Sequence, residues 1–182
     1  MRNAGPAPAR HVVLVGPMGS GKSTLGRGLA SRLGVAFVDV DARIVAAAGC
    51  DIPSLFASEG EAGFRQRETQ VLAEALVGEA AVIATGGGAV LTEANRISMH
   101  DAGRVIYLQV DAATQLARLT GDTGRPLLAT ADRAQRLADL QAIREPLYRE
   151  VAHLIFDTSA LAPDAAVVAL AAWLATTETI NA

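Results

Sequence analysis

The chain has 182 residues, of which 51% are hydrophobic, 19% charged and 4% aromatic, and its formal net charge is −3. These values fit one compact α/β domain with a substantial core. An acidic balance without a basic tract argues against nucleic-acid binding. No apolar run approaches the roughly 20 residues that would span a membrane.

Residues 11–175 are expected to form one domain, between an Ala/Pro-rich lead-in at residues 1–10 and a C-terminal tail at residues 176–182. The only cysteine, Cys50, cannot form an internal disulfide, and it fits a packed thiol better than a nucleophile. We therefore expect a cytoplasmic protein. Because no large exposed apolar stripe is evident, we also expect a monomer.

The most informative segment follows the first predicted strand, His11–Val15. Gly16–Thr24 contains the pattern G-x-x-x-x-G-K-S/T, and its Lys22 is the only lysine in the sequence. The glycines let the backbone wrap an anion, and a helix that begins near Gly21 directs its N–H groups toward a phosphate. Lys22 can reach the β- and γ-phosphates, and the hydroxyl of Ser23 suits Mg²⁺. The pattern predicts a loop that binds a nucleoside triphosphate.

Two aspartates follow the second predicted strand, Val35–Val38, which comes after a helix that ends at Gly34. Strand alternation would place Asp39 and Asp41 on one side, near the phosphate-binding loop. Asp39 could then hold Mg²⁺, directly or through water, and Asp41 would lie where an acceptor hydroxyl sits. Alternatively, the pair is a helix N-cap with a second acid in the first turn, and one residue can fill both roles.

A long helix is expected from Glu61 to about Val77, with Arg65 and Glu68 on one face. This pair could be a solvated ion pair that contributes little to stability. It could also present the forked guanidinium of Arg65, held by Glu68, to a substrate carboxylate. The residues by themselves favour neither interpretation.

Three consecutive glycines, Gly86–Gly88, follow the third predicted strand, Ala81–Ala84. They expose backbone N–H groups and permit close approach of a ligand, so a ligand-facing loop is favoured over a plain turn. No aspartate ends this strand. The metal-binding acid is therefore assigned to Asp39.

Two further arginines lie between the last predicted strands, Arg104–Val110 and His153–Phe156. Arg125 belongs to a polar, glycine-containing stretch, where it could close over the γ-phosphate or be an ordinary surface residue. Arg144 precedes Pro146, which is expected to end or kink its helix. Because strands and helices alternate, we predict a parallel sheet covered on both faces, with ligands at the carboxyl ends of the strands.

These segments, in this order, resemble the shikimate kinase family from about His11 to Trp173. The resemblance is carried by GPMGSGKST, DVD, GFRQRE, TGGGA, RPLL and REPLY. The first motif is specific by itself, and the others gain weight from their order. The resemblance implies a three-layer α/β/α P-loop kinase fold, like that of nucleoside monophosphate kinases, with a five-stranded parallel sheet in the order 2-3-1-4-5.

The resemblance also implies roles for individual residues. ATP would be bound by Gly19, Ser20, Gly21, Lys22, Ser23, Thr24, Arg118 and Arg125. Mg²⁺ would be held by Ser23 and Asp39. Shikimate would be bound by Asp41, Arg65, Gly87 and Arg144, with Glu68 steadying the two arginines. The catalytic residues would be Asp41, Lys22 and Arg125.

Two larger segments receive roles in the same way. The substrate-binding segment would be about residues 39–70, and the lid about residues 119–131. Arg118 would flank the adenine, beside a segment, Phe156–Pro163, that resembles the family's adenine loop. Some members carry a polar or basic side chain there, whereas this chain has Ala160 and Leu161.

The leading hypothesis is ATP-dependent phosphorylation of the 3-hydroxyl of shikimate, a step of aromatic amino acid biosynthesis. One alternative is a related kinase of another small hydroxy acid, such as gluconate, but GFRQRE and TGGGA favour shikimate. Another is a nucleotide-sensing module that has lost catalysis. That alternative predicts damage at the key positions, and Asp41, Arg65, Arg125 and Arg144 are all present.

Overall fold

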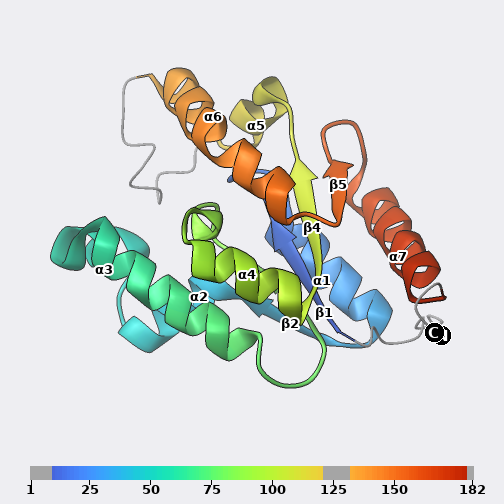
Figure 1. Ribbon diagram of the computed structural model, residues 1–182. Coiled ribbons are helices and arrows are strands. Elements are labelled where there is room, and N and C mark those ends of the chain that lie inside the picture. The colour runs from blue at the N-terminus through green and yellow to red at the C-terminus, as the bar shows by residue number, and fades with distance from the viewer. Residues whose placement is uncertain (1–9, 121–131, 180–182) are drawn as a thin grey trace.

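A computed structural model describes residues 10–120 and 132–179 of the chain, which form a five-stranded parallel sheet with helices on both faces (Figure 1). The strands are β1 (His11–Val15), β2 (Ala36–Asp39), β3 (Ala81–Ala84), β4 (Gly103–Gln109) and β5 (Leu154–Asp157). Their order in the sheet is β2-β3-β1-β4-β5, and every neighbouring pair is parallel. The expected strand order and fold class are therefore confirmed.

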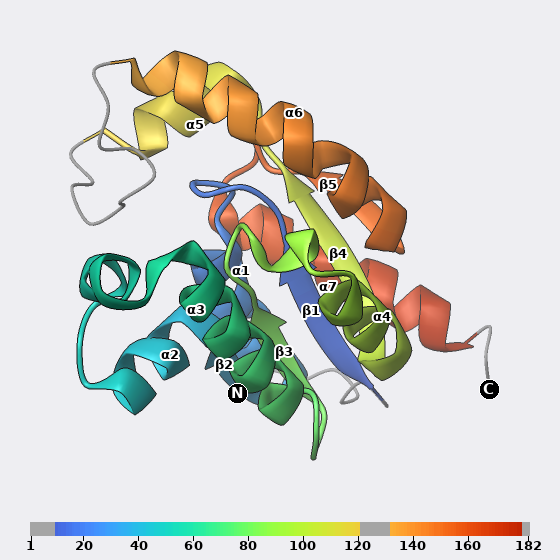
Figure 2. The ribbon, with the colours of Figure 1, turned by 60° about the vertical axis from the view of Figure 1, so that its left-hand side comes forward.

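The helices form the two outer layers. They are α1 (Lys22–Leu33), α2 (Val40–Ala48), α3 (Ile52–Ala75), α4 (Glu93–Ala102), α5 (Ala112–Arg118), α6 (Arg133–Val151) and α7 (Pro163–Thr179), with a short 3-10 helix, η1 (Ala89–Leu91). Helices α1 and α7 pack together on one face of the sheet, and α3, α4 and α6 cover the other (Figures 1 and 2).

The central strand explains why the sequence forms this sandwich. Val12 and Leu14 pack against α1 and α7, whereas Val13 and Val15 pack on the side of α3, α4 and α6. All four side chains are fully buried, because successive residues of a strand point to opposite faces and both faces are covered. Each such burial stabilises the fold by about 1.5–3 kcal/mol.

Several element boundaries differ from those expected. Strands β2 and β5 each lie one residue later along the chain, because the ladder extends through Asp39 and Asp157, and β4 lies one residue earlier. Helix α6 does not end at Pro146 but continues to Val151. Helix α7 extends to Thr179, into the segment expected to be a tail.

Helix α3 begins at Ile52, earlier than expected, and ends at Ala75 rather than near Val77. It is interrupted at Gly60, whose φ of 69° and ψ of −178° are not helical, so a second helical segment starts where a helix was expected. In the described part of the chain, no helix has the length and apolar character needed to cross a membrane.

Candidate active site

A cavity of about 560 Å³ opens at the carboxyl ends of β1, β2 and β3. Its lining combines the phosphate-binding loop with residues that follow β2 and β3: Met18, Gly19, Gly21, Lys22, Ser23, Thr24, Asp39, Asp41, Ala42, Val45, Ile52, Thr85 and Gly87. Three segments far apart in sequence therefore meet where a parallel sheet is expected to bind ligands.

The phosphate-binding loop turns sharply before α1. Gly19 and Gly21 have φ values of 77° and 92°, which side chains with a Cβ rarely adopt. The ammonium of Lys22 donates to the carbonyls of Gly16 and Pro17 at 2.7 and 2.8 Å. Helix α1 begins at Lys22, as expected, so its amino end faces the cavity and favours a negative charge there.

Side chains from outside the loop hold its backbone. The Gln115 amide donates to the Met18 carbonyl at 2.8 Å. The Arg118 guanidinium donates to the Gly19 carbonyl at 3.1 Å. The Thr158 hydroxyl donates to the Ser20 carbonyl at 3.2 Å. Arg118 also donates to the hydroxyl and the carbonyl of Thr158, at 3.1 and 2.8 Å. Arg118 thus lies between the phosphate-binding loop and the loop after β5, next to the expected adenine loop.

Ser23 and Asp39 lie in direct contact, since the serine hydroxyl donates to a carboxylate oxygen of Asp39 at 2.7 Å. The other oxygen of Asp39 accepts the N–H of Ala42 at 3.2 Å and caps α2. Adjacent hydroxyl and carboxylate oxygens are the donor set that a hard cation such as Mg²⁺ prefers. The residues present therefore fit the expected metal.

The expected strand alternation at Asp39 and Asp41 is wrong. The capping bond of Asp39 begins α2 at Val40, so Asp41 stands in the first helical turn rather than on an extended strand. Both carboxylates nevertheless line the cavity, as the sequence led us to expect. The N-cap alternative holds for Asp39, in the same residue that contacts Ser23.

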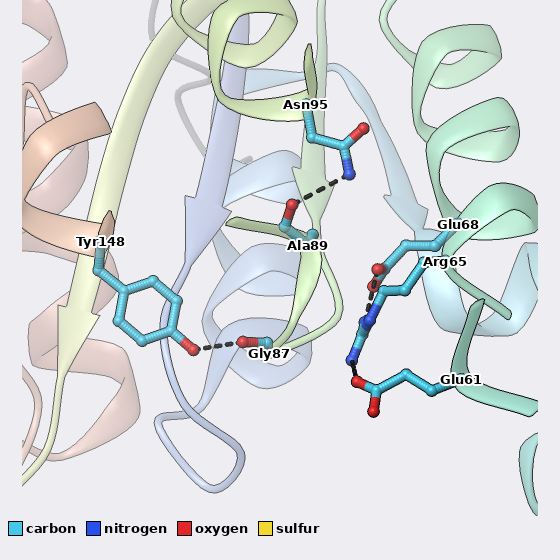
Figure 3. Close-up of polar contacts among 7 residues, drawn as sticks. All are labelled: Glu61, Arg65, Glu68, Gly87, Ala89, Asn95 and Tyr148. Carbon is cyan, nitrogen blue, oxygen red and sulfur yellow. Dashed lines mark hydrogen bonds and ion pairs between the residues drawn. The ribbon is translucent and has the colours of Figure 1, made fainter. Parts of the chain in front are cut away.

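Beside the cavity lies a group of four charged residues that we call the acceptor cluster: Asp41, Arg65, Glu68 and Arg144. Within it, Arg65 and Glu68 form an ion pair at 2.6 Å, and Arg65 also pairs with Glu61 at 3.2 Å (Figure 3). Glu68 is fully buried, so the two residues do not form the solvated pair that the sequence left open.

Burial and neighbouring charges act on these groups in opposite directions. Burial raises the pKa of Glu68, while the Arg65 guanidinium opposes the rise and Asp41 adds to it. Burial acts to lower the pKa of Arg65, but its ion pairs with Glu68 and Glu61 hold that pKa above its usual value. Burial lowers the pKa of Arg144, which is only 5% exposed.

Three buried polar atoms of the acceptor cluster lack a hydrogen-bond partner within the described residues: Arg65 Nε, Glu68 Oε1 and Arg144 Nε. Buried polar atoms are rarely left unpaired in folded proteins, and each exception has a cost. Two unpaired guanidinium N–H groups in one cluster would suit a carboxylate ligand, which accepts hydrogen bonds from such forks.

The glycine loop, Gly86–Gly88, makes room for the cluster. A Cβ on Gly88 would lie within 2.5 Å of all three terminal guanidinium atoms of Arg65. A Cβ on Gly86 would lie 2.5 Å from a carboxylate oxygen of Glu68 and 2.8 Å from one of Asp41. Gly86 and Gly88 are therefore needed because charged side chains pass directly over them. The sequence had indicated a different reason, the close approach of a ligand.

The middle glycine, Gly87, does line the cavity. A Cβ there would meet nothing closer than 3.5 Å, and among its nearest atoms is a guanidinium nitrogen of Arg144 at 3.6 Å. The structure therefore brings together all the expected site residues that it describes. Arg125 and residues 121–131 of the expected lid lie outside the described residues.

Sequence reasoning missed several residues that hold the site. Gln115, Thr158 and Tyr148 each contact loop backbone that is at least 61 residues away along the chain. Tyr148 belongs to the REPLY segment, which contributed to the resemblance, but the sequence suggested no role for this residue. The apolar side chains of Val45 and Ile52, which line the cavity, had no signal at all.

This sheet order, this phosphate-binding loop and the acceptor cluster beside the same cavity together define a P-loop kinase of small molecules. The sequence profile of the shikimate kinase family matches residues 18–175. A shikimate kinase from Stenotrophomonas maltophilia (strain R551-3) is 53% identical over 151 residues, which cover 83% of this chain and 84% of that protein. The chain belongs to the shikimate kinase family, and the resemblance found in the sequence is confirmed.

Solved structures agree with this assignment. A shikimate kinase from Acinetobacter baumannii in complex with shikimate has a TM-score of 0.90 and 43% identity, covering 92% of this chain and 94% of that one. A gluconokinase from Sinorhizobium meliloti has a TM-score of 0.58 and 16% identity, a likeness that shows the fold alone. The comparisons therefore favour shikimate over gluconate and kinase activity over a sensing module.

Proposed function

We propose that this protein transfers the γ-phosphoryl group of ATP to the 3-hydroxyl of shikimate, giving shikimate 3-phosphate and ADP. One observation carries the proposal beyond family membership. A single cavity joins the phosphate-binding loop to Asp41 and Gly87, and the guanidinium groups of the partly buried Arg65 and the buried Arg144 lie against that same glycine loop. A phosphate donor and a carboxylate-bearing acceptor can thus be held side by side.

On the nucleotide side, the N–H groups of the phosphate-binding loop would hold the phosphates of ATP. Lys22 would neutralise charge on the moving phosphoryl group, because its ammonium is already directed to this loop at 2.7 Å from the Gly16 carbonyl. Arg118 would flank the adenine. Arg125 would meet the γ-phosphate from the lid.

Ser23 and Asp39 would hold Mg²⁺, directly or through water, since their oxygen atoms lie 2.7 Å apart. The ion, when bound with ATP, screens the negative charge of the phosphates. Asp39 keeps its second oxygen on the N–H of Ala42, so capping fixes the orientation of the carboxylate.

On the acceptor side, Arg65 and Arg144 would clasp the carboxylate of shikimate. Their buried Nε atoms are without partners among the described residues, so a carboxylate would satisfy donors that are now costly. Glu68 would keep Arg65 in place through their 2.6 Å ion pair. Asp41 would orient the 3-hydroxyl and accept its proton as the new P–O bond forms.

Phosphorylation of two acids under the same conditions tests this proposal. The purified protein, ATP and Mg²⁺ are incubated with shikimate or with gluconate, and the products are identified by mass spectrometry and ³¹P NMR. We expect shikimate 3-phosphate from the first reaction and negligible product from the second. Turnover of gluconate without turnover of shikimate would refute the assignment, and turnover of neither would favour the sensing module. That the protein is a monomer and that it lies in the cytoplasm both stay predictions. Light scattering of the purified protein tests the first by measuring its mass.

A further inference from the structure

The two tyrosines of the sequence, Tyr107 and Tyr148, stack in the core with ring centroids 5.0 Å apart, and neither side chain is exposed. Their hydroxyls have different partners. The Tyr107 hydroxyl accepts from the Gln141 amide at 3.0 Å, whereas the Tyr148 hydroxyl donates to the Gly87 carbonyl at 2.5 Å (Figure 3). One tyrosine thus reaches the glycine loop, and its neighbour does not.

A buried tyrosine hydroxyl usually finds some hydrogen-bond partner, so the bond by itself does not indicate a role in substrate binding. The identity of the partners does. Gly87 lines the cavity, and the Tyr148 hydroxyl also interacts with the guanidinium of Arg144, four residues earlier on α6. The hydroxyl therefore lies between two groups that are proposed to bind shikimate.

The bond to the carbonyl also fixes the direction of an N–H group. All peptide bonds in the described segments are trans, so the Gly87 carbonyl and the Gly88 N–H lie in one plane and point in opposite directions. Three consecutive glycines would otherwise allow this peptide to rotate at small cost. Asn95 donates to the carbonyl of Ala89, the residue that follows the loop, at 3.0 Å, so side chains from α6 and α4 hold the backbone in the glycine loop and directly after it (Figure 3).

We propose that Tyr148 is a positioning residue for the acid substrate. Its hydroxyl holds the peptide between Gly87 and Gly88 and the Arg144 guanidinium in the arrangement that binds the acceptor. The identity of that acceptor rests on the proposed function. The role of Tyr148 in ordering the loop does not depend on it.

Kinetics of two matched variants test the role in binding. Tyr148→Phe should raise the shikimate KM about tenfold while the ATP KM stays within about twofold of the wild type. Tyr107→Phe, which removes the neighbouring hydroxyl of the same stack, should leave both constants within about twofold. An equal rise of shikimate KM in both variants would overturn the proposal, as would an equal rise for both substrates in Tyr148→Phe.

Amide hydrogen exchange of the free protein tests the same role without activity. Tyr148→Phe should speed exchange in residues 85–90 about tenfold, and Tyr107→Phe should not, while exchange in α1 stays unchanged in both. Unaltered loop exchange in Tyr148→Phe would refute the positioning role. If the wild type failed to phosphorylate shikimate, the proposed function would fall, and exchange would still decide what Tyr148 does.

Discussion

The two sides of the cavity are built in different ways. On the nucleotide side, most of the groups come from one continuous segment, Gly16–Thr24, which leads into the start of α1. On the acceptor side, the groups are charged side chains from α2, α3 and α6, arranged around the glycine loop after β3. The first side is formed largely by one local segment that distant side chains hold in place, and the second is assembled from several segments by tertiary packing.

This difference reflects what each side must recognise. Phosphates are common to many ligands, and a helix amino end with a lysine binds them wherever the loop occurs. A particular hydroxy acid requires groups at defined distances in three dimensions. Changes on the acceptor side should therefore alter the use of the acid and leave the use of ATP largely intact.

The largest expected effect comes from Asp41, where the two sides meet. Asp41→Asn should lower kcat by about 10² to 10⁴, because the amide cannot accept the proton of the acceptor hydroxyl. ATP binding, measured by isothermal titration calorimetry, should survive. Asp51→Asn is the control, since Asp51 caps α3 through the N–H of Ser54 and asparagine caps equally well. Near-normal turnover of Asp41→Asn would remove Asp41 from the chemistry.

Lys22→Arg tests the nucleotide side by itself. It keeps the positive charge, but a broad planar guanidinium should not reproduce the contacts of the ammonium with Gly16 and Pro17. We expect kcat to fall by about 10² to 10³, with shikimate binding unchanged by calorimetry. A variant with wild-type turnover would mean that charge alone suffices at this position.

Arg65→Ala tests the acceptor side by itself. It removes a charged donor from the proposed carboxylate clasp, so the shikimate KM should rise about 10- to 100-fold while the ATP KM changes little. Steady-state kinetics with each substrate varied in turn measure the difference. An unchanged shikimate KM would count against the clasp.

Two further variants keep this test free of effects on folding. Arg65→Ala leaves Glu68 buried without its partner, which destabilises the protein, so Arg65→Ala combined with Glu68→Gln is measured beside it. Arg67→Ala is the matched control on the same helix. Its guanidinium pairs with Glu59 in a far more exposed position, and both KM values should stay near those of the wild type.

The smallest expected effect lies far from both sides, at His153. Its Nδ1 accepts the N–H of Val105 at 3.1 Å, and its ring stacks on His100 at 4.6 Å. Burial, followed by the nearby His100 and Arg104, lowers the pKa of His153. The unfolded chain therefore binds a proton at His153 more readily than the folded protein does. The stability that neutral His153 contributes is present above about pH 6.5, and it is lost as the pH falls toward the lower pKa of the folded state.

His153→Asn keeps an acceptor near the same place but does not titrate. Between pH 7.5 and pH 5, the Tm of the wild type should fall about 2–4 °C further than that of His153→Asn, the effect of one lost hydrogen bond. Differential scanning calorimetry provides the measurement, with His100→Asn as a control that keeps the bond to Val105. Parallel pH dependence of the wild type and His153→Asn would exclude His153 as the cause.

The contrast between the two sides also decides how much could be predicted from sequence. The phosphate-binding loop was recognisable because its pattern is local, and β1 and β3 were predicted at their observed bounds because each is a short apolar run. The strand order came from family resemblance. At Asp41 the strand alternation was wrong, and the N-cap alternative that the sequence also allowed is the one observed, because the choice depends on whether the Asp39 carboxylate accepts the N–H of Ala42.

On the acceptor side, sequence named the charged residues but left their state open. Whether Arg65 and Glu68 form a solvated or a buried pair depends on what covers them, which one sequence does not contain. On the nucleotide side, the anchors Gln115 and Thr158 contact the backbone of the phosphate-binding loop 97 and 138 residues away, so no local pattern could have indicated them. The steric need for Gly86 and Gly88 likewise became visible only with the side chains in place.

The central claim is that both sides of the cavity act together in one reaction. Shikimate-dependent ADP formation by the purified protein, with ATP and Mg²⁺ present, tests it most directly. We expect turnover of about 1–100 s⁻¹ with saturating shikimate and a rate at least about a hundredfold lower without it. ADP formation at the same rate with and without shikimate would contradict the account.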